Sequence, residues 1–487
     1  MSLDALYKRL QAVPMLKITL CVMGGILLHR YLELPVIGLI ALFVVAGLGS
    51  ILYQRVACYV VALLAAGYLL ATWHATPELP PRERELKMVI NVLDDGVRRP
   101  RTHRFEARLK QWCEPTDSVW HPSSGRLWLY SDTLRVLRGG ERLLVEGRID
   151  PFAEDTALWA RQLWYKGYLG RCYLNPHLDT QPLEGGSASL HLRATRALDE
   201  RLQHRTDDAA ALIHAMTVGN RNLISSTLRA TYARSGFSHL MALSGLHVGM
   251  LFLLINLVLW WLPLFHRGHR LKHLLAIGAV WLFVAVAGFP ISAIRAAVMC
   301  TLLQWALFSS APYRSVNSWA AAALLLLLYE PNWLFDIGYQ LSFLAVGAIL
   351  MVGLPLCQQV RGRYRLLNYL SDAFLISIVA SLATMPLAAY RFGVWPLAGI
   401  VMNPIAIFVA TIVVACGVLL LLLPPLAPLL RPLTLMAADW VNQLSAKVAS
   451  MTALVVDFRP SGLLVTAIYL IFLLLILLLW CRDAKKM

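Results

Sequence analysis

The stretch that decides the fold is His239-Leu-Met-Ala-Leu-Ser244-Gly245-Leu-His247-Val-Gly249, at the mouth of an apolar run that continues to Leu264. On a helix, residues three apart share a face, so Ser244 and His247 would be neighbours. A stripe of small residues beside them would let helices pack closely in lipid. The small residues are Ala242, Gly245 and Gly249. This pattern predicts a helix that lines a path inside a membrane bundle. Interfacial histidines that merely flank a packing motif are the alternative.

Apolar runs recur along the whole chain of 487 residues, of which 58% are hydrophobic and 15% charged. Soluble proteins usually carry about 25% charged residues, and about 20 apolar residues cross a bilayer. We therefore predict a polytopic α-helical membrane protein of about 10–12 spans. Three spans lie in 1–73, a polar domain occupies 74–198, and about nine spans lie in 199–487. The short run 316–330 and the run 395–423, which contains two prolines, could be broken or re-entrant helices.

The net charge of +16 has two explanations. It could reflect affinity for nucleic acid, or Lys and Arg that orient the chain in the membrane. With the N-terminus in the cytoplasm, the basic residues gather in the predicted cytoplasmic loops. This asymmetry is what the positive-inside rule expects, and it predicts that the 74–198 domain is extracytoplasmic.

The polar domain 74–198 has the pattern of a β structure. Short alternating runs are separated by turn residues, and one helical pattern intervenes between Pro151 and Gly167. The pattern fits a small OB-like barrel, and it also fits other small β domains. Cys113 and Cys172 are the only cysteines of this domain. In an oxidising compartment they would form one disulfide, the alternative being two buried thiols.

A run of basic residues in this domain could bind single-stranded DNA. Arginine and lysine hold the backbone of a single strand, and aromatic rings stack on its bases. A solvated charged strand is the alternative. The run consists of Arg98, Arg99, Arg101, Arg104, Arg108 and Lys110, close to Trp112 and Trp120.

Polar residues also interrupt the later apolar runs. Arg295 would face a partner or a wet cavity, unless it snorkels to the interface. Asp336 and Gln340 lie at one end of a span, where Asp336 could instead cap a helix. Pro386 and Asn403-Pro404 are breakers of the kind found at transporter sites. Nucleotide-binding and metal-binding motifs are absent, so we expect no cofactor, no metal and no enzymatic activity.

Three blocks, in order, resemble the ComEC competence family. They are His239 to His247, Phe335-Asp-Ile-Gly-Tyr-Gln-Leu-Ser-Phe-Leu-Ala345, and Met385-Pro-Leu through Phe392 to Asn403-Pro404. The resemblance implies an inner-membrane channel that admits single-stranded DNA during natural transformation. By position, it assigns the paired cysteines of the OB-like domain to Cys113 and Cys172. It gives as channel-lining candidates His239, Ser244, His247, Arg295, Asp336 and Gln340.

The sequence departs from the family pattern in several places. Many members continue into a metallo-β-lactamase-like domain, whereas this chain ends at Met487 without an HxHxDH run. We expect a short form without nuclease activity, which works with membrane lipid, a separate nuclease, a DNA receptor and a cytosolic ATP-driven translocase. Asn220, in Gly219-Asn220-Arg221, stands where an acidic residue is expected, and Asp155-Thr-Ala-Leu replaces the usual Asn-Pro-Gly. A transporter or receptor for another polyanion or small solute, and an intramembrane Ser/His hydrolase using Ser244, are the alternatives.

Overall fold

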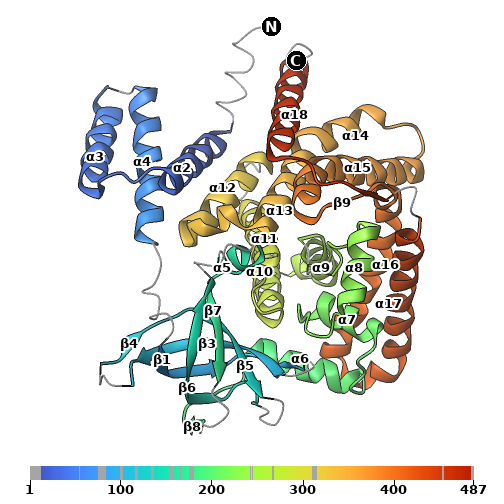
Figure 1. The fold of residues 1–487 in the computed structure, drawn as a ribbon. Helices are drawn as coiled ribbons and strands as arrows, with labels where there is room; N and C mark the ends of the chain where they lie inside the picture. Colours follow the sequence, from blue (N-terminus) through green and yellow to red (C-terminus); the bar gives the residue numbers. More distant parts are fainter. Residues whose placement is uncertain are drawn as a thin grey trace. The chain divides into compact units, whose positions relative to one another are not determined.

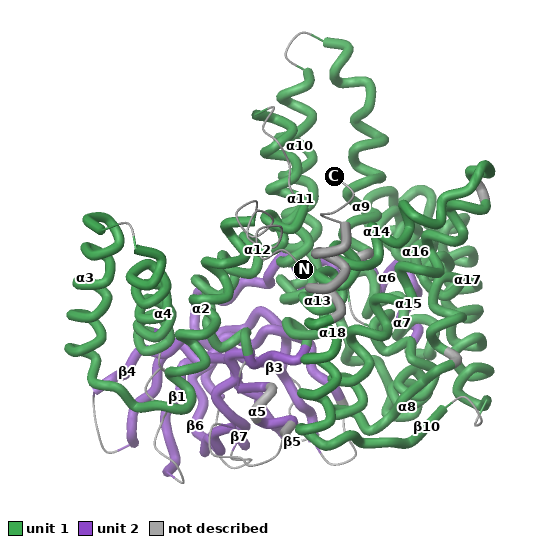
Figure 2. The backbone as a smooth tube through the Cα atoms, turned by 90° about the horizontal axis from the view of Figure 1, so that it is seen from above, with its two compact units in different colours: residues 1–73, 206–334, 338–487 green, residues 74–205, 335–337 purple. Residues whose placement is uncertain are grey.

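The computed structural model describes residues 13–53, 55–74, 84–98, 102–115, 119–132, 137–152, 158–164, 166–174, 180–241, 243, 245–265, 268–309, 315–451 and 455–483. The chain forms two compact units, coloured separately in Figure 2. The helical unit comprises 1–73, 206–334 and 338–487, and the barrel unit comprises 74–205 with 335–337.

The helical unit begins with three helices, α2 (Pro14–Tyr31), α3 (Val36–Tyr53) and α4 (Val56–Trp73). Helices α2 and α4 touch through glycines. A Cβ on Gly25 would lie 2.0 Å from the Leu64 carbonyl oxygen, and one on Gly67 would lie 2.2 Å from that of Val22. Only glycine allows this approach, which is typical of helices packed in lipid.

Figure 1 shows the remaining helices of this unit, and from α9 onward their bounds follow the apolar runs closely. A π-helical turn, Ile349–Gly353, joins α13 to α14. Helix α16 continues unbroken through Pro404, so the interruption considered for 395–423 is absent. The strands β9 (Val394–Pro396) and β10 (Val455–Asp457), which lie far apart in the sequence, pair antiparallel. The helices are α7 (Asp208–Thr217), α8 (Ser226–Ser235), α9 (Gly245–Val258), α10 (Gly268–Val286), α11 (Ile291–Phe308), α12 (Ser315–Tyr329), α13 (Ile337–Ala348), α14 (Leu354–Val360), α15 (Arg365–Phe392), α16 (Leu397–Leu422), α17 (Ala427–Ala449) and α18 (Gly462–Asp483).

Eight helices within the described ranges are long and apolar enough to cross a membrane, and Ser315–Tyr329 and Gly462–Leu474 are shorter apolar helices. Large apolar side chains stay exposed on them, for example Leu253, Leu257 and Phe408. Because lipid replaces water around such helices, exposed leucine and phenylalanine are expected there. The helical unit is therefore a multi-pass membrane structure.

The barrel unit closes five strands into a ring: β1 (Glu85–Val92), β3 (Thr102–Cys113), β5 (Arg126–Asp132), β7 (Tyr168–Leu174) and β6 (Arg142–Pro151). Strand β6 pairs back to β1, and the β5–β7 pair is parallel. Short strands β2 (Val97–Arg98), β4 (His121–Pro122) and β8 (Gln181–Leu183) pair with the longer ones. The sequence therefore indicated correctly a small β domain with one helix, α5 (Leu158–Trp164), before the last long strand.

The predicted disulfide between Cys113 and Cys172 is not formed. Cys172 lies in the barrel core, where it pairs with Leu129, and its burial raises the pKa of its thiol to about 12. Trp112 also belongs to this core, so its neighbour Cys113 lies on the other side of the barrel wall, because successive side chains of a strand point to opposite faces.

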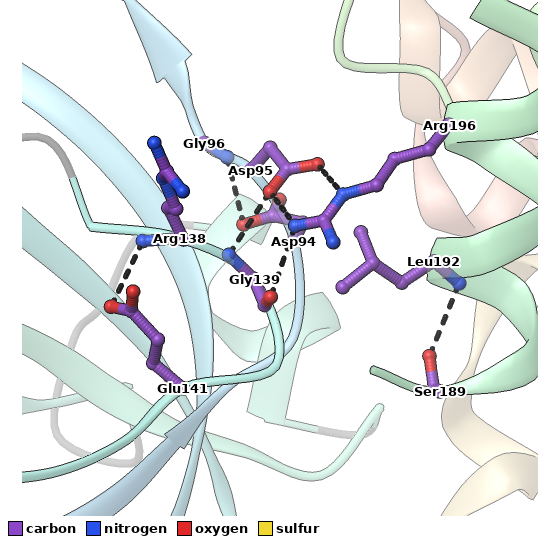
Figure 3. Close-up of polar contacts among 9 residues, drawn as sticks. All are labelled: Asp94, Asp95, Gly96, Arg138, Gly139, Glu141, Ser189, Leu192 and Arg196. Carbon is purple, nitrogen blue, oxygen red and sulfur yellow. Dashed lines mark hydrogen bonds and ion pairs between the residues drawn. The ribbon is translucent and has the colours of Figure 1, made fainter. Parts of the chain in front are cut away.

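Helix α6 (Leu190–Arg201) is fastened to the barrel by the contacts in Figure 3. Arg196 Nε donates to Asp95 Oδ2 at 2.8 Å, and its Nη2 donates to the Gly139 carbonyl at 3.0 Å. Partial burial raises the pKa of Asp95, but the hydrogen bonds from Arg196 and from the Gly139 amide outweigh it and hold that pKa below its usual value. Leu192 packs so tightly that a Cβ on Gly139 would lie 2.7 Å from it. The barrel unit thus includes α6.

Candidate functional site

The predicted close-packing helix is α9, and it packs against α11. A Cβ on Gly245 would lie 3.5 Å from the Ala296 Cβ, and the Ser292 hydroxyl donates to the Leu243 carbonyl. Ala242 and Ser244 lie outside the described residues, so the role of Ser244 stays a prediction. The contacts fix the first turn of α9 and with it the position of His247.

The two histidines of the motif lie near one another. His247 is fully buried on α9, and His239 is close enough for their charges to interact. His239 belongs to the turn after α8, and the residue that caps this helix, Gly236, has a φ of +82° and lies against Pro396. The His239 side chain is exposed to solvent although much protein lies around it, so it lies in a recess of the helical unit.

Arg221 shares this combination of exposure and enclosure, and the sequence analysis did not select it. It follows the turn at Gly219, where φ is +73° and a Cβ would lie 2.8 Å from the Ala287 carbonyl oxygen. Burial lowers the pKa of the Arg221 guanidinium, and the nearby positive charge of Arg229 lowers it further. Two positive charges near one another attract an anion. In the sequence, Arg221 is marked only as a basic residue that follows the turn Gly219-Asn220.

Arg295 lies inside the helical unit, with 4% of its surface exposed. Its Nη1 donates to the Gly338 carbonyl at 2.8 Å and to the Tyr339 carbonyl at 3.2 Å, and the guanidinium lies 5.4 Å from the Phe343 ring centroid. All three partners belong to the first two turns of α13. The structure therefore favours an internal partner over snorkelling, and Arg295 joins α11 to α13.

Asp336 and Gln340 lie around the start of α13 and make different contacts. Asp336 is buried, and its Oδ2 lies 3.7 Å from the Nζ of Lys166 within the barrel unit. Gln340 Nε2 donates to the Leu334 carbonyl at 2.9 Å and so fixes the 3-10 turn Pro331–Phe335 against α13. Asp336 and Gln340 thus stabilise the segment that leads into α13, whereas His239 and His247 lie at the turn between α8 and α9.

A second polar network, also missed from the sequence, joins α9, α10 and α11. Asn256 Nδ2 donates to the Phe252 carbonyl at 2.9 Å, and Gln304 Nε2 donates to Asn256 Oδ1 at 3.0 Å. Gln304 Oε1 must then accept from His273 Nδ1, with which it is in contact. The other ring nitrogen of His273 lies 3.3 Å from His269 Nε2. The chain of donors thus fixes the orientation of each amide and the tautomer of His273.

The basic run of the barrel unit is described only in part. Arg99 and Arg101 lie outside the described residues, and for Arg98 only the backbone is described, which pairs with His103. Arg104 and Arg108 alternate with the buried residues of β3, and Lys110 is exposed on the same strand. Trp112, by contrast, is 7% exposed in the barrel core and stacks on His121, with ring centroids 4.4 Å apart. Its ring is not an open platform for a base.

The fold and the buried charged groups define a multi-pass helical membrane protein with a polar interior. The competence protein family model matches residues 216–483, which include Arg221, His239, His247 and Arg295. The chain belongs to the ComEC competence protein family.

Two curated relatives support this assignment. ComE operon protein 3 of Bacillus subtilis (strain 168) is 27% identical over 292 residues, covering 58% of this chain and 35% of the relative. Competence protein ComA of Neisseria gonorrhoeae is 27% identical over 290 residues, covering 55% of this chain and 38% of the relative. The matched region thus spans little more than a third of either relative. No solved structure matches the chain.

Proposed function

We propose that this chain forms a path for single-stranded DNA across a bacterial inner membrane during natural transformation. The observation that supports the proposal is that His239 and Arg221 both lie exposed to solvent in recesses of the helical unit, with Arg229 near enough to Arg221 for their charges to interact. A charge inside a membrane bundle is costly and normally marks a substrate path. A strand with one negative charge per nucleotide needs positive groups along its route.

In this proposal Arg221 and His239 contact the passing phosphates, and Arg295 holds the wall of the path by binding carbonyl groups of α13. His247, buried on α9, lies close enough to His239 for their charges to interact. Conduction makes and breaks no covalent bond, so the chain is not an enzyme. The energy comes from a cytosolic ATP-driven translocase, while a separate nuclease and a DNA receptor prepare the strand.

We assign the barrel unit to the extracytoplasmic side as an OB-like domain. Its closed ring β1-β3-β5-β7-β6 supports that assignment, since OB folds are five-stranded barrels. The lysines and arginines of the predicted cytoplasmic loops support the orientation. On that side the barrel would meet the incoming strand before the helical unit does.

The test is DNase-resistant uptake of labelled DNA into the cytoplasm, compared between wild type, a deletion strain and the variants His247→Ala and Arg221→Gln. All variants are compared at equal membrane abundance. The matched control is Arg459→Gln, because Arg459 is an exposed arginine that also bonds a carbonyl, that of Tyr390. We expect the deletion to abolish uptake, and both variants to reduce it at least tenfold while DNA still reaches the periplasm. Normal import by the deletion strain would overturn the proposal.

The pair Arg221 and Arg229 also suits other polyanions, which keeps a polyanion transporter as the second candidate. Competition separates the two. Excess unlabelled single-stranded DNA should suppress uptake of the label in a DNA path, whereas inorganic polyphosphate of equal charge should not. Suppression by polyphosphate alone would favour the second candidate.

A further inference from the structure

Two histidines lie in the first turns of α10, a helix that packs against α9 and α11 (Figure 2). His269 is exposed to solvent, whereas His273 is 4% exposed. Residues four apart share one face of a helix, so the two rings are neighbours. Their Nε2 atoms lie 3.3 Å apart, and their ring planes are nearly perpendicular, at 88°. The pair therefore brings two ring nitrogens together where a buried network reaches solvent.

The network behind His273 decides which of its two nitrogens carries the proton. Asn256 donates to the Phe252 carbonyl, so its Oδ1 accepts from Gln304 Nε2 at 3.0 Å. Gln304 Oε1 can only accept, and His273 Nδ1 must donate its proton to it. A neutral imidazole has a single N–H, so His273 Nε2 carries a lone pair, which faces His269. Metal-binding histidines have this arrangement, because their other ring nitrogen usually donates to an oxygen that fixes the ring.

The position of the two rings fits a direct hydrogen bond poorly. Hydrogen bonds from N–H groups are usually about 2.7–3.2 Å long, and these nitrogens are 3.3 Å apart. Two rings joined by a straight bond of that length would have centroids roughly 5.5 Å apart. The centroids of His269 and His273 are 4.6 Å apart. The two nitrogens therefore meet at an angle, as two ligands of one ion do.

The distance between the nitrogens matches a tetrahedral zinc ion. Two nitrogens at about 2.0–2.1 Å from such an ion are about 3.3–3.4 Å apart. Adjacent nitrogens of a square-planar copper(II) site with similar bond lengths would be only about 2.9 Å apart. Within the described residues no larger group of His, Cys, Asp and Glu gathers around the pair, so water completes the coordination. Arg270 and Lys272 lie beside the pair in the sequence, and their charge keeps the affinity for a cation moderate.

We propose that His269 and His273 bind an exchangeable zinc ion through their Nε2 atoms, with Gln304 as the outer partner that fixes His273. The ion joins the exposed ring to the buried one and so stabilises the packing of α10 against α9 and α11. These two neighbouring helices carry His247 and Arg295. The motif His-x-x-x-His is shorter than the metal motifs whose absence led us to expect no metal. The site lies apart from the proposed DNA path and does not depend on it.

The experiment measures zinc binding by the full chain, purified without a histidine tag in nanodiscs of zwitterionic lipid, in competition with a fluorescent zinc chelator. His269→Ala removes one ligand but leaves the contact between His273 and Gln304 in place. We expect it to weaken the tightest zinc site by more than about 100-fold, and Gln304→Leu to weaken it by about 10- to 100-fold, the usual effect of losing an outer partner. The matched control is His204→Ala, because His204 is an exposed histidine bonded to a carboxylate, that of Asp199. This control should bind zinc as wild type does.

X-ray absorption spectroscopy of the zinc-loaded wild-type chain identifies the ligands without any substitution. We expect nitrogen and oxygen ligands at about 2.0–2.1 Å, two of them imidazoles, and no sulfur at about 2.3 Å. Cobalt(II) in place of zinc should give the intense visible absorption of a tetrahedral site, and His269→Ala should lose it.

Three outcomes contradict the proposal: unchanged zinc affinity in His269→Ala, fewer than two imidazole ligands in wild type, or sulfur among the ligands. The X-ray measurement uses wild-type protein, so it decides the question even where a variant folds poorly. Zinc binding that is lost in His204→Ala but kept in His269→Ala would place the ion in the barrel unit instead and would also refute the proposal.

Discussion

Arginine 295 allows a test in which two conservative changes should give opposite results in two assays. It donates to the Gly338 and Tyr339 carbonyls and lies over the Phe343 ring. Hydrogen bonds from a charged group contribute about 1.5–3 kcal/mol each, and the ring contact adds about 0.5–2 kcal/mol. Against this stands the cost of burying the charge, which is several kcal/mol.

Arg295→Met removes the contacts and the burial cost together. The two carbonyls remain able to accept the helical hydrogen bonds of α13. We therefore expect a net loss of only about 1–3 kcal/mol in the free energy of unfolding. Arg295→Lys keeps the buried charge but replaces the planar, weakly hydrated group with a strongly hydrated point charge that matches the two carbonyls and the ring poorly. We expect this variant to lose about 3–5 kcal/mol, as when one partner of a buried charge is removed.

The assay is reversible unfolding of the purified chain by SDS titration, with Arg459→Lys as the exposed control, for which we expect a change within about 0.5 kcal/mol. Uptake of DNA per folded molecule is then measured for the same variants. Because lysine can still donate to a carbonyl of α13 and methionine cannot, the lysine variant should keep the wall in place better and conduct better per folded molecule, despite its lower stability. The reasoning is refuted if Arg295→Lys is as stable as wild type, or if Arg295→Met loses more than about 5 kcal/mol in the free energy of unfolding.

Three other changes test separate parts of the structure. The pKa of Asp95 is lower in the folded chain than in the unfolded chain, so its contribution to stability is present at neutral pH and is lost as the pH falls through the folded pKa. Asp95→Asn should therefore be less stable than wild type at pH 7 and as stable as wild type well below about pH 3.9. Urea unfolding followed by circular dichroism measures both stabilities. Gln304→Leu strands the Asn256 oxygen and should cost about 1–3 kcal/mol in the same SDS unfolding assay, and adding Asn256→Leu should recover part of the loss rather than add to it. Burial raises the pKa of Cys172 to about 12, so at pH 8 iodoacetamide should modify it only after denaturation, as mass spectrometry of the alkylated peptide would show.

Helix positions could be predicted from the sequence because apolar runs report burial in lipid directly. The run 316–330 is α12 to within one residue at each end, and the run 395–423 is α16 to within two residues. The small-residue stripe is confirmed only in part: Gly245 contacts α11, whereas nothing lies within 4 Å of a Cβ on Gly249. These features depend on local pattern alone.

The position of Trp112 could not be predicted because a β-bulge reverses the alternation of β3. Phe105, Ala107 and Leu109 point inward, and strict alternation would turn Trp112 outward. The pairing with β1 shifts by one residue between Val89 and Ile90, so the two residues after Leu109 are both exposed and Trp112 points into the core. The same shift places Cys113 across the wall from Cys172. One inserted residue thus accounts for both differences from expectation.

Some site residues could be recognised from the local sequence, and others are brought together only by tertiary packing. His239, His247 and Arg295 stood out because a polar group in an apolar run is costly. Arg221 carries no such mark, since it follows a glycine turn between two short helices of mixed composition. The pair Gln304–His273 joins different elements, so no spacing along the chain reveals it.

The two enclosed arginines of the helical unit differ in what their charge is used for. Arg295 has carbonyl oxygens and a ring as partners, which compensate its burial and leave it to hold α11 and α13 together. Arg221 lies instead near another positive charge, and burial and repulsion both lower its pKa. An anion at this place would relieve both effects, whereas an anion at Arg295 would have to displace partners already bound. In the proposed path, Arg221 therefore contacts the phosphates, and Arg295 maintains the shape of the wall.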